Sequence, residues 1–177
     1  MIYGSAVRSK YPRAIVKAIH TEKAKALPGV VCVLTADDVP GKNKVGHLKQ
    51  DWDTMIAVGD TTRYLGDAIC LVAAETPEIL EQAKALVEVE YEKLKPVTCP
   101  AEAMEEGAPL VHSTGNILSH EHLVRGNADE VIAASKYKVT RHYETPWTEH
   151  AFLEPECAVS MPFDGGVLIY STDQGTY

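Results

Sequence analysis

Histidines near the middle of the chain are the first residues whose spacing suggests chemistry. His120 and His122 flank Glu121, and in an extended segment this i, i+2 spacing places both rings on one side. His112 and His150 are the histidines that could join them around a metal ion. The segment lies in a predicted linker, however, and no further ligand stands at a fixed spacing. We therefore expect exposed loop histidines and no metal site.

A second group is Thr148-Glu149-His150, where a glutamate beside a histidine could serve in acid–base catalysis. The alternative is structural, because Glu149, Glu154 and Glu156 could accept hydrogen bonds from backbone amides where strands meet. The residues alone favour the structural alternative. The sequence also lacks a Gly-x-Ser-x-Gly nucleophile elbow and a glycine-rich phosphate loop. Spacing alone therefore yields no strong catalytic motif.

The composition is that of an ordinary globular protein, with 45% hydrophobic and 24% charged residues among 177. A net charge of −8 and the lack of a dense Lys/Arg run argue against nucleic-acid or membrane partners. The chain shows no signal peptide and no apolar run of about 20 residues. None of the four cysteines sits in a CxxC pair, which argues against a zinc ribbon or an iron–sulfur loop. These features favour a cytoplasmic protein with reduced thiols.

The first half of the sequence predicts an α/β domain. Four strands are expected, at 14–19, 30–35, 68–74 and 87–92. The second and third are continuous apolar runs, which is typical of buried strands. Two helices are expected, each with a threonine as its N-cap, at 21–27 and 77–87. Residues 36–39 predict a single helical turn, and residues 41–55 an irregular surface loop.

The second half predicts a linker and then a β-rich segment. A helix is expected near 127–135, followed by three strands at 136–144, 157–161 and 167–171. Such a meander would leave one apolar face uncovered, and the sequence stops soon after Ser171. We therefore expect a truncated second domain. The expected division is an α/β domain at 1–107, a linker with a short helix at 108–135, and β-strands at 136–177.

Three stretches together carry a resemblance to a known family. They are RAIVKAIHTEKAKALPGVVCVLTADDVPGKN at 13–43, TTRYLGDAICLVAAETPEILEQAKALVEVEYEKLKPV at 61–97 and ETPWTEHAFLEPECAVSMPFDGGVLIYSTDQ at 144–174. The first two resemble the α/β hammerhead domain of the molybdenum-binding large subunit in the xanthine dehydrogenase and aldehyde oxidase family. The third resembles the start of that subunit's first molybdopterin-binding domain. The resemblance covers nearly the whole chain.

The resemblance implies an oxidoreductase of the kind found in purine catabolism, which hydroxylates a heteroaromatic or aldehyde carbon with oxygen from water. The implied cofactor is molybdenum-molybdopterin, with 2Fe-2S clusters and FAD on other domains or subunits. Gln174 matches a family glutamine that lies beside the molybdenum oxo ligand. Asp173 is the alternative if the register shifts by one, because the family usually shows Thr-Gln. We prefer Gln174, since an amide can donate a hydrogen bond to that oxygen and a carboxylate cannot.

The rest of the family's active site lies downstream of this segment, so no catalytic set is complete here. Glu149 and His150 match a Glu-His pair, to which we assign a structural role. We expect the chain alone to be inactive and to bind no cofactor. Expected partners are the remainder of the molybdenum subunit and the iron–sulfur and FAD subunits or domains, and a homodimer is left open. The alternative is a non-catalytic hammerhead-like scaffold or assembly module. The substrate stays open among purines, nicotinate, aldehydes and carbon monoxide, all of which members of this family use.

Overall fold

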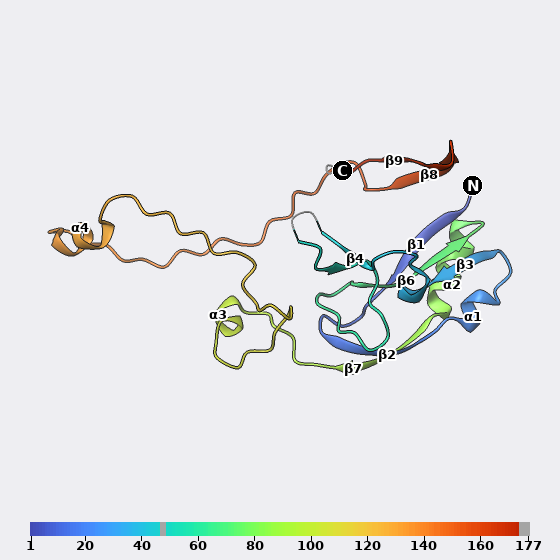
Figure 1. Ribbon diagram of the computed structural model, residues 1–177, viewed down its shortest axis with the longest axis horizontal. Coiled ribbons are helices and arrows are strands. Elements are labelled where there is room, and N and C mark those ends of the chain that lie inside the picture. Colours follow the sequence, from blue (N-terminus) through green and yellow to red (C-terminus); the bar gives the residue numbers. More distant parts are fainter. Residues whose placement is uncertain (47–48, 174–177) are drawn as a thin grey trace. The chain divides into compact units, whose positions relative to one another are not determined.

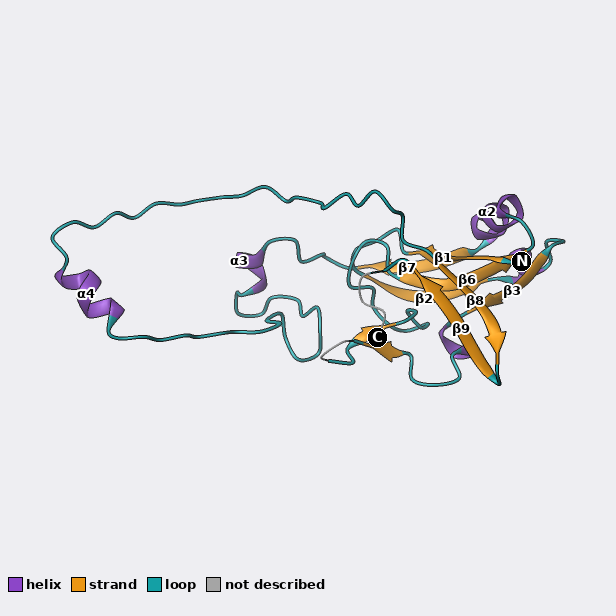
Figure 2. Ribbon diagram, turned by 90° about the horizontal axis from the view of Figure 1, so that it is seen from above, coloured by secondary structure: helices purple, strands orange, loops and turns teal. Residues whose placement is uncertain are grey.

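The computed structural model describes residues 1–46 and 49–173, and the chain divides into two compact units, Met1–His122 and Leu123–Tyr177 (Figure 1). The first unit contains, in chain order, β1 (Tyr3–Arg8), β2 (Ala14–His20), α1 (Glu22–Lys25), β3 (Val30–Leu34), the 3-10 turn η1 (Ala36–Asp38), β4 (Lys44–Val45), β5 (Trp52–Asp53), β6 (Ala68–Ala74), α2 (Pro77–Leu86), β7 (Glu88–Lys93) and α3 (Pro100–Ala103). The second contains α4 (Ala128–Ala134), β8 (Ala158–Phe163) and β9 (Gly166–Ser171). Figure 2 shows that loops flank α4.

Strand β6 is the centre of the first unit. It pairs antiparallel with β1 on one side and β3 on the other, giving the sheet order β1-β6-β3. Its alternate residues Cys70, Val72 and Ala74 are buried and belong to one apolar cluster, whereas Ile69 belongs to another. Because successive side chains of a strand point to opposite faces, β6 contributes to two cores at once. This position confirms the buried strand predicted at 68–74.

Helix α2 covers the first of these cores. Leu80 and Ala83 are buried in the same cluster as Cys70 and Val72. The predicted start is confirmed: the Thr76 hydroxyl accepts a hydrogen bond from the Ile79 amide at 3.3 Å, and Pro77 occupies the first turn. The strand–helix–strand segment 68–93 therefore supplies most of its own apolar cover.

Strands β2 and β7 form a separate antiparallel pair that covers the second core. Val16 is buried with Ile56 and Ile69, and Val89 and Tyr91 pack against them. On the opposite face the glutamates of β7 contact basic side chains, namely Lys23 at Glu88, His20 at Glu90 and Lys17 at Glu92. One face of this pair is thus apolar and packed, and the other is charged and solvated, which fits the α/β fold class expected from the sequence.

The second unit is a short helix followed by a hairpin. The Asn127 side chain caps α4 by accepting a hydrogen bond from the Glu130 amide at 3.4 Å. In the hairpin, Phe163 pairs with Gly166 across a two-residue turn. Both turn residues have positive φ, 46° at Asp164 and 74° at Gly165, as a primed hairpin turn requires. The predicted hairpin is confirmed, with a tighter turn than expected.

Four predictions about local structure were wrong. Residues 136–144 form no strand, because alternation supplies a pattern but not the neighbouring strand that must complete the hydrogen bonds. Residues 41–55 are not only a surface loop, since β4 pairs with β5 and Asp53 and Met55 are buried. Helix α1 spans only four residues instead of the predicted 21–27; Thr21 is its N-cap as predicted, although its side chain makes no capping hydrogen bond.

The fourth error concerns β3. In this strand only Val33 is buried, and Val31, which lies at an irregularity in the pairing with β6 between Val30 and Cys32, is 52% exposed. Helix α3 was not expected from the sequence pattern. Among the helices that the structure describes, none has the length and apolar character needed to span a bilayer.

Candidate functional site

The segment that leads to the predicted cofactor contact is fixed by Thr172. Its hydroxyl donates to the Pro155 carbonyl at 3.1 Å and accepts from the Cys157 amide at 3.0 Å. Its own amide donates to the Cys157 carbonyl at 3.2 Å. Gln174 lies outside the described residues, so its contact stays a prediction. The backbone two residues earlier is held against 155–157 by these hydrogen bonds.

Asp173 is the alternative contact. Its carboxylate accepts a hydrogen bond from the Ser171 hydroxyl, and its amide donates to the same hydroxyl oxygen at 3.4 Å. These bonds engage Asp173 within its own turn. A carboxylate also offers no donor to a metal-bound oxygen, so both observations favour Gln174 for the contact.

The structure does not bring Glu149 and His150 together as an acid–base pair. The Glu149 carboxylate accepts from the backbone amide of His150 at 3.1 Å, and the imidazole stacks on Phe152 with ring centroids 5.4 Å apart. Both residues are exposed. A carboxylate bonded to a backbone amide agrees with the structural interpretation of this pair, and its role in the family's domain stays a prediction.

The other histidines also lack a common centre. The rings of His120 and His122 meet edge to face with centroids 6.3 Å apart, and both are exposed. His112 forms an isolated bridge with Gly115. Across the described residues, no group of three His, Cys, Asp or Glu side chains is placed to hold a metal ion.

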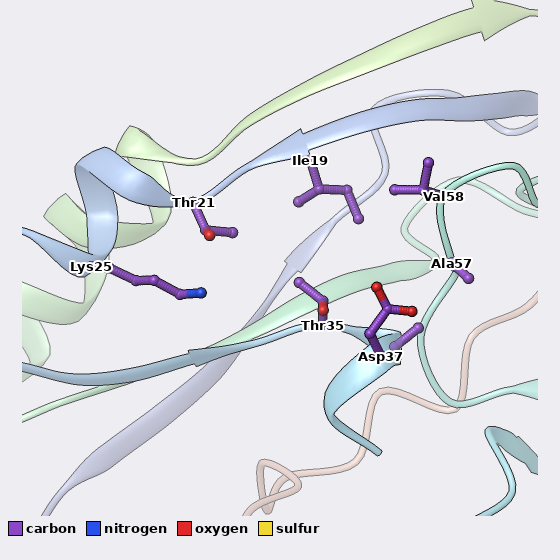
Figure 3. A pocket seen from close by; sticks show the side chains of 8 residues that line it. Ile19, Thr21, Lys25, Thr35, Asp37, Ala57 and Val58 are labelled. Atoms are coloured by element: carbon purple, nitrogen blue, oxygen red, sulfur yellow. The ribbon is translucent and has the colours of Figure 1, made fainter. Parts of the chain in front are cut away.

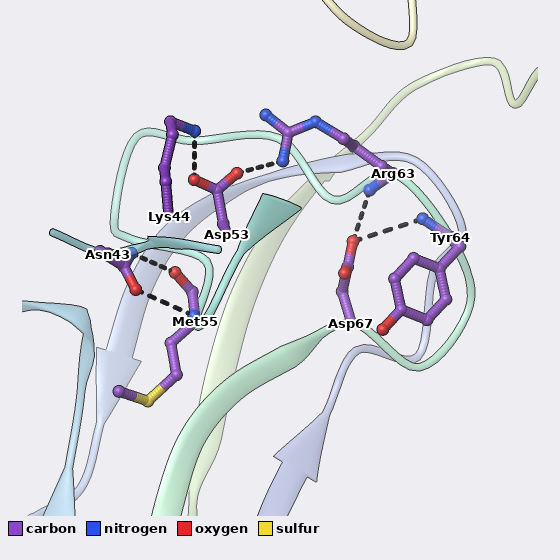
Figure 4. Close-up of polar contacts among 7 residues, drawn as sticks. All are labelled: Asn43, Lys44, Asp53, Met55, Arg63, Tyr64 and Asp67. Atoms are coloured by element: carbon purple, nitrogen blue, oxygen red, sulfur yellow. Dashed lines mark hydrogen bonds and ion pairs between the residues drawn. The ribbon is translucent and has the colours of Figure 1, made fainter. Parts of the chain in front are cut away.

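A polar cluster that sequence reasoning missed joins residues 43–44, 53–55 and 63–67 (Figure 4). The Asp53 side chain is only 3% exposed and forms ion pairs with both Lys44 and Arg63. Burial alone would raise the pKa of Asp53, but hydrogen bonds from Lys44 and Arg63 and their positive charges hold it below its usual value. Asp53 is therefore an ionised, fully engaged carboxylate, suited to fixing a loop rather than to proton transfer.

Two further side chains complete this cluster. Asn43 bonds both backbone groups of Met55, donating to its carbonyl at 2.6 Å and accepting from its amide at 3.1 Å. The Asp67 carboxylate accepts from the Arg63 amide at 2.6 Å and the Tyr64 amide at 3.3 Å. The sequence signal available was the Arg-Tyr-x-Gly stretch, but its partner ten residues earlier follows no fixed spacing.

Comparison with known proteins identifies both parts of the chain. The family model described as aldehyde oxidase and xanthine dehydrogenase, a/b hammerhead domain, matches residues 1–95. The chain belongs to this family. A second model, the molybdopterin cofactor-binding domain, matches residues 111–177 of this family member. The predicted family and fold class are thereby confirmed.

Several relatives match this aldehyde oxidase and xanthine dehydrogenase family chain over its whole length. It is 39% identical to a probable xanthine dehydrogenase subunit of Bacillus subtilis, covering 100% of the chain and 24% of that protein. It is 34% identical to the nicotinate dehydrogenase large molybdopterin subunit of Eubacterium barkeri, covering 100% and 42% respectively. Among solved structures, aldehyde oxidoreductase from Desulfovibrio gigas matches with a TM-score of 0.88 and 26% identity, over 96% of this chain and 20% of that one. The chain thus spans less than half the length of these proteins.

Proposed function

We propose that this chain supplies the hammerhead domain and the first part of the molybdopterin-binding domain of a molybdenum hydroxylase. The observation that carries this proposal is the order of the two family models, 1–95 and then 111–177, on one chain. In the proposed reaction a heteroaromatic or aldehyde carbon is hydroxylated with oxygen from water. The names of the two relatives, xanthine dehydrogenase and nicotinate dehydrogenase, favour a heteroaromatic substrate.

We propose Gln174 as this chain's contact to the molybdenum-molybdopterin cofactor. The fit rests on Thr172, whose hydrogen bonds to Pro155 and Cys157 fix the backbone that precedes Gln174. An amide side chain presented from a fixed strand end can donate a hydrogen bond toward an oxygen of the cofactor. When bound, the molybdenum centre would accept the electrons released by the substrate. This chain's own part is to orient one donor toward it.

The further expectations belong to the same proposal. The domain boundaries are 1–107, 108–135 and 136–177. The remainder of the molybdenum subunit and iron–sulfur and FAD subunits or domains act as partners, in the cytoplasm. Because these residues span 24% of the Bacillus relative, the 177-residue chain by itself should bind no molybdenum and show no activity. A cofactor needs an enclosing pocket, to which this chain contributes one wall.

The test measures molybdenum content and dye reduction in the complete enzyme purified with its partners. Xanthine, nicotinate and an aldehyde are the substrates to compare. We expect Gln174→Ala to lower kcat about tenfold or more, since it removes a hydrogen bond made at the reacting centre. The matched control is Gln82→Ala, because Gln82 is exposed on α2 and should leave the rate unchanged. A complete enzyme without molybdenum, or equal rates for both variants, would contradict the proposal.

A further inference from the structure

A polar recess lies in the first unit (Figure 3). It has a volume of about 210 Å³ and is formed by the end of β2, helix α1, the turn η1 and the loop after Ile56. Its lining residues are Ile19, Thr21, Lys25, Thr35, Ala36, Asp37, Ala57 and Val58. Neither of the two family roles proposed above uses this recess.

Thr21 is the buried polar residue of the recess. It is only 6% exposed, and its side chain makes no capping hydrogen bond to α1. Its hydroxyl points into the recess and has no hydrogen-bond partner in the part of the chain that the structure describes (Figure 3). Among the described residues, the side-chain atom that is fully buried without a partner is Arg63 Nε, so the Thr21 hydroxyl oxygen is open to the recess. The Thr21 hydroxyl is therefore available to a water or to a ligand in the recess.

Lys25 and Asp37 are the charged residues of the recess, and neither side chain forms an ion pair or hydrogen bond among the described residues. The charge of Lys25 also reaches Asp38, but that carboxylate already accepts hydrogen bonds from the Thr35 amide and hydroxyl. Figure 3 shows Lys25 and Thr21 toward one end and Asp37 toward the other, beside Ala57 and Val58. The recess is therefore positive at one end and negative at the other.

We propose that this recess binds a small zwitterion, with its carboxylate on Lys25 and Thr21 and its ammonium on Asp37. The class follows from the charges: a lysine and a hydroxyl can both donate to a carboxylate, and a carboxylate accepts from an ammonium. The size follows from the volume, since about 210 Å³ admits a small molecule and not a large one. This site is independent of the proposed hydroxylase function, because it shares no residue with the cofactor contact.

The test titrates the full chain with glycine, β-alanine and 4-aminobutyrate, which carry the same two charges at increasing separation. Acetate and methylammonium serve as probes with one charge each. We expect saturable shifts of the backbone NMR signals of Thr21, Lys25, Asp37 and Ala57 with at least one zwitterion. Acetate and methylammonium should bind more weakly, since each satisfies only one end.

Substitutions test which end of the recess binds the carboxylate and which binds the ammonium. Lys25→Gln and Asp37→Asn should each weaken binding of that zwitterion about tenfold, and Thr21→Val, which keeps the volume, about fivefold. Lys23→Gln on the same helix and Asp129→Asn in the second unit should bind like the unaltered chain. Backbone NMR spectra of each variant show whether it is folded. The proposal is overturned if no zwitterion gives saturable shifts, if one single-charge probe binds equally well, or if the variants bind as tightly as their controls.

Discussion

The two units of this chain contain similar apolar patterns but bury them to different extents. In the first unit Val16, Ile56 and Ile69 are at most 1% exposed. In the second, Phe163 is 62% and Ile169 60% exposed, and none of residues 123–173 is buried. The difference follows from what each strand has beside it. Strand β6 has α2 on one face and β2 on the other, whereas the hairpin β8–β9 has neither a helix nor a second sheet packed on it among the described residues of its unit.

This contrast shows where stability resides. Apolar burial contributes roughly 25 cal/mol of stability per Å² removed from water. The buried strands of the first unit therefore stabilise it, whereas the exposed hairpin gains little stability from burial within its own unit. A lone two-stranded hairpin is marginally stable at best. We therefore expect the first unit to unfold cooperatively by itself, and substitutions in the hairpin to leave that transition unchanged.

The largest expected effect compares two isoleucines, one in each unit. Ile69→Ala should destabilise the first unit by about 2–5 kcal/mol, because it opens a cavity at a fully buried position. Ile169→Ala should change the free energy of unfolding by less than about 0.5 kcal/mol, because that side chain is 60% exposed. Urea denaturation, followed by NMR signals from each unit, measures both. Similar losses for the two variants would mean that the hairpin is part of the same cooperative core.

Asp53 provides the next largest effect, and it is electrostatic. Asp53→Asn should cost about 1–3 kcal/mol, because Arg63 and Lys44 lose a buried charged acceptor. The matched control is Asp129→Asn, an exposed aspartate on α4, which should be neutral. Urea denaturation at about pH 7 compares the two.

The same variant gives a pH dependence of known sign. The pKa of Asp53 is lowered in the folded state, so its contribution is complete above the unfolded value of about 3.9 and is lost as the pH falls through the folded value. The stability gap between the unaltered chain and Asp53→Asn should therefore shrink in acid. A gap that widened on acidification would show that Asp53 is not held ionised by Lys44 and Arg63.

The sequence allowed much of the first unit to be predicted because its elements are locally encoded. The apolar run of β6 and the Thr76-Pro77 cap specify their own structure, and both were confirmed. The Asp53 cluster could not be predicted, because Lys44, Asp53 and Arg63 meet through tertiary contacts with no periodic spacing. Residues 136–144 show that a local pattern is not sufficient either: they alternate like a strand but form none, because no partner strand pairs with them.

The cofactor contact proposed at Gln174 has a different origin. Gln174 came from family resemblance, because an amide after a strand has no distinguishing pattern of its own. The structure adds the hydrogen bonds of Thr172 to residues 155–157. No local rule predicts them, since those residues precede the hairpin and Thr172 follows it. Resemblance thus predicted the family, which the comparisons confirm, whereas the contact at Gln174 stays a prediction.

The smallest predicted effect separates two helices with similar caps. Thr76→Ala should destabilise the first unit by about 1 kcal/mol, because the Ile79 amide loses its acceptor in a helix that packs on the core. Asn127→Ala removes the equivalent bond to the Glu130 amide, but α4 spans seven exposed residues. A helix that short is marginal without packing, so its cap should affect local helicity and not the cooperative transition. Urea denaturation measures the first effect, and amide signals of 128–134 measure the second. If Asn127→Ala shifted the urea midpoint of the first unit as much as Thr76→Ala does, α4 would be energetically coupled to that core, and the two units would not be independent.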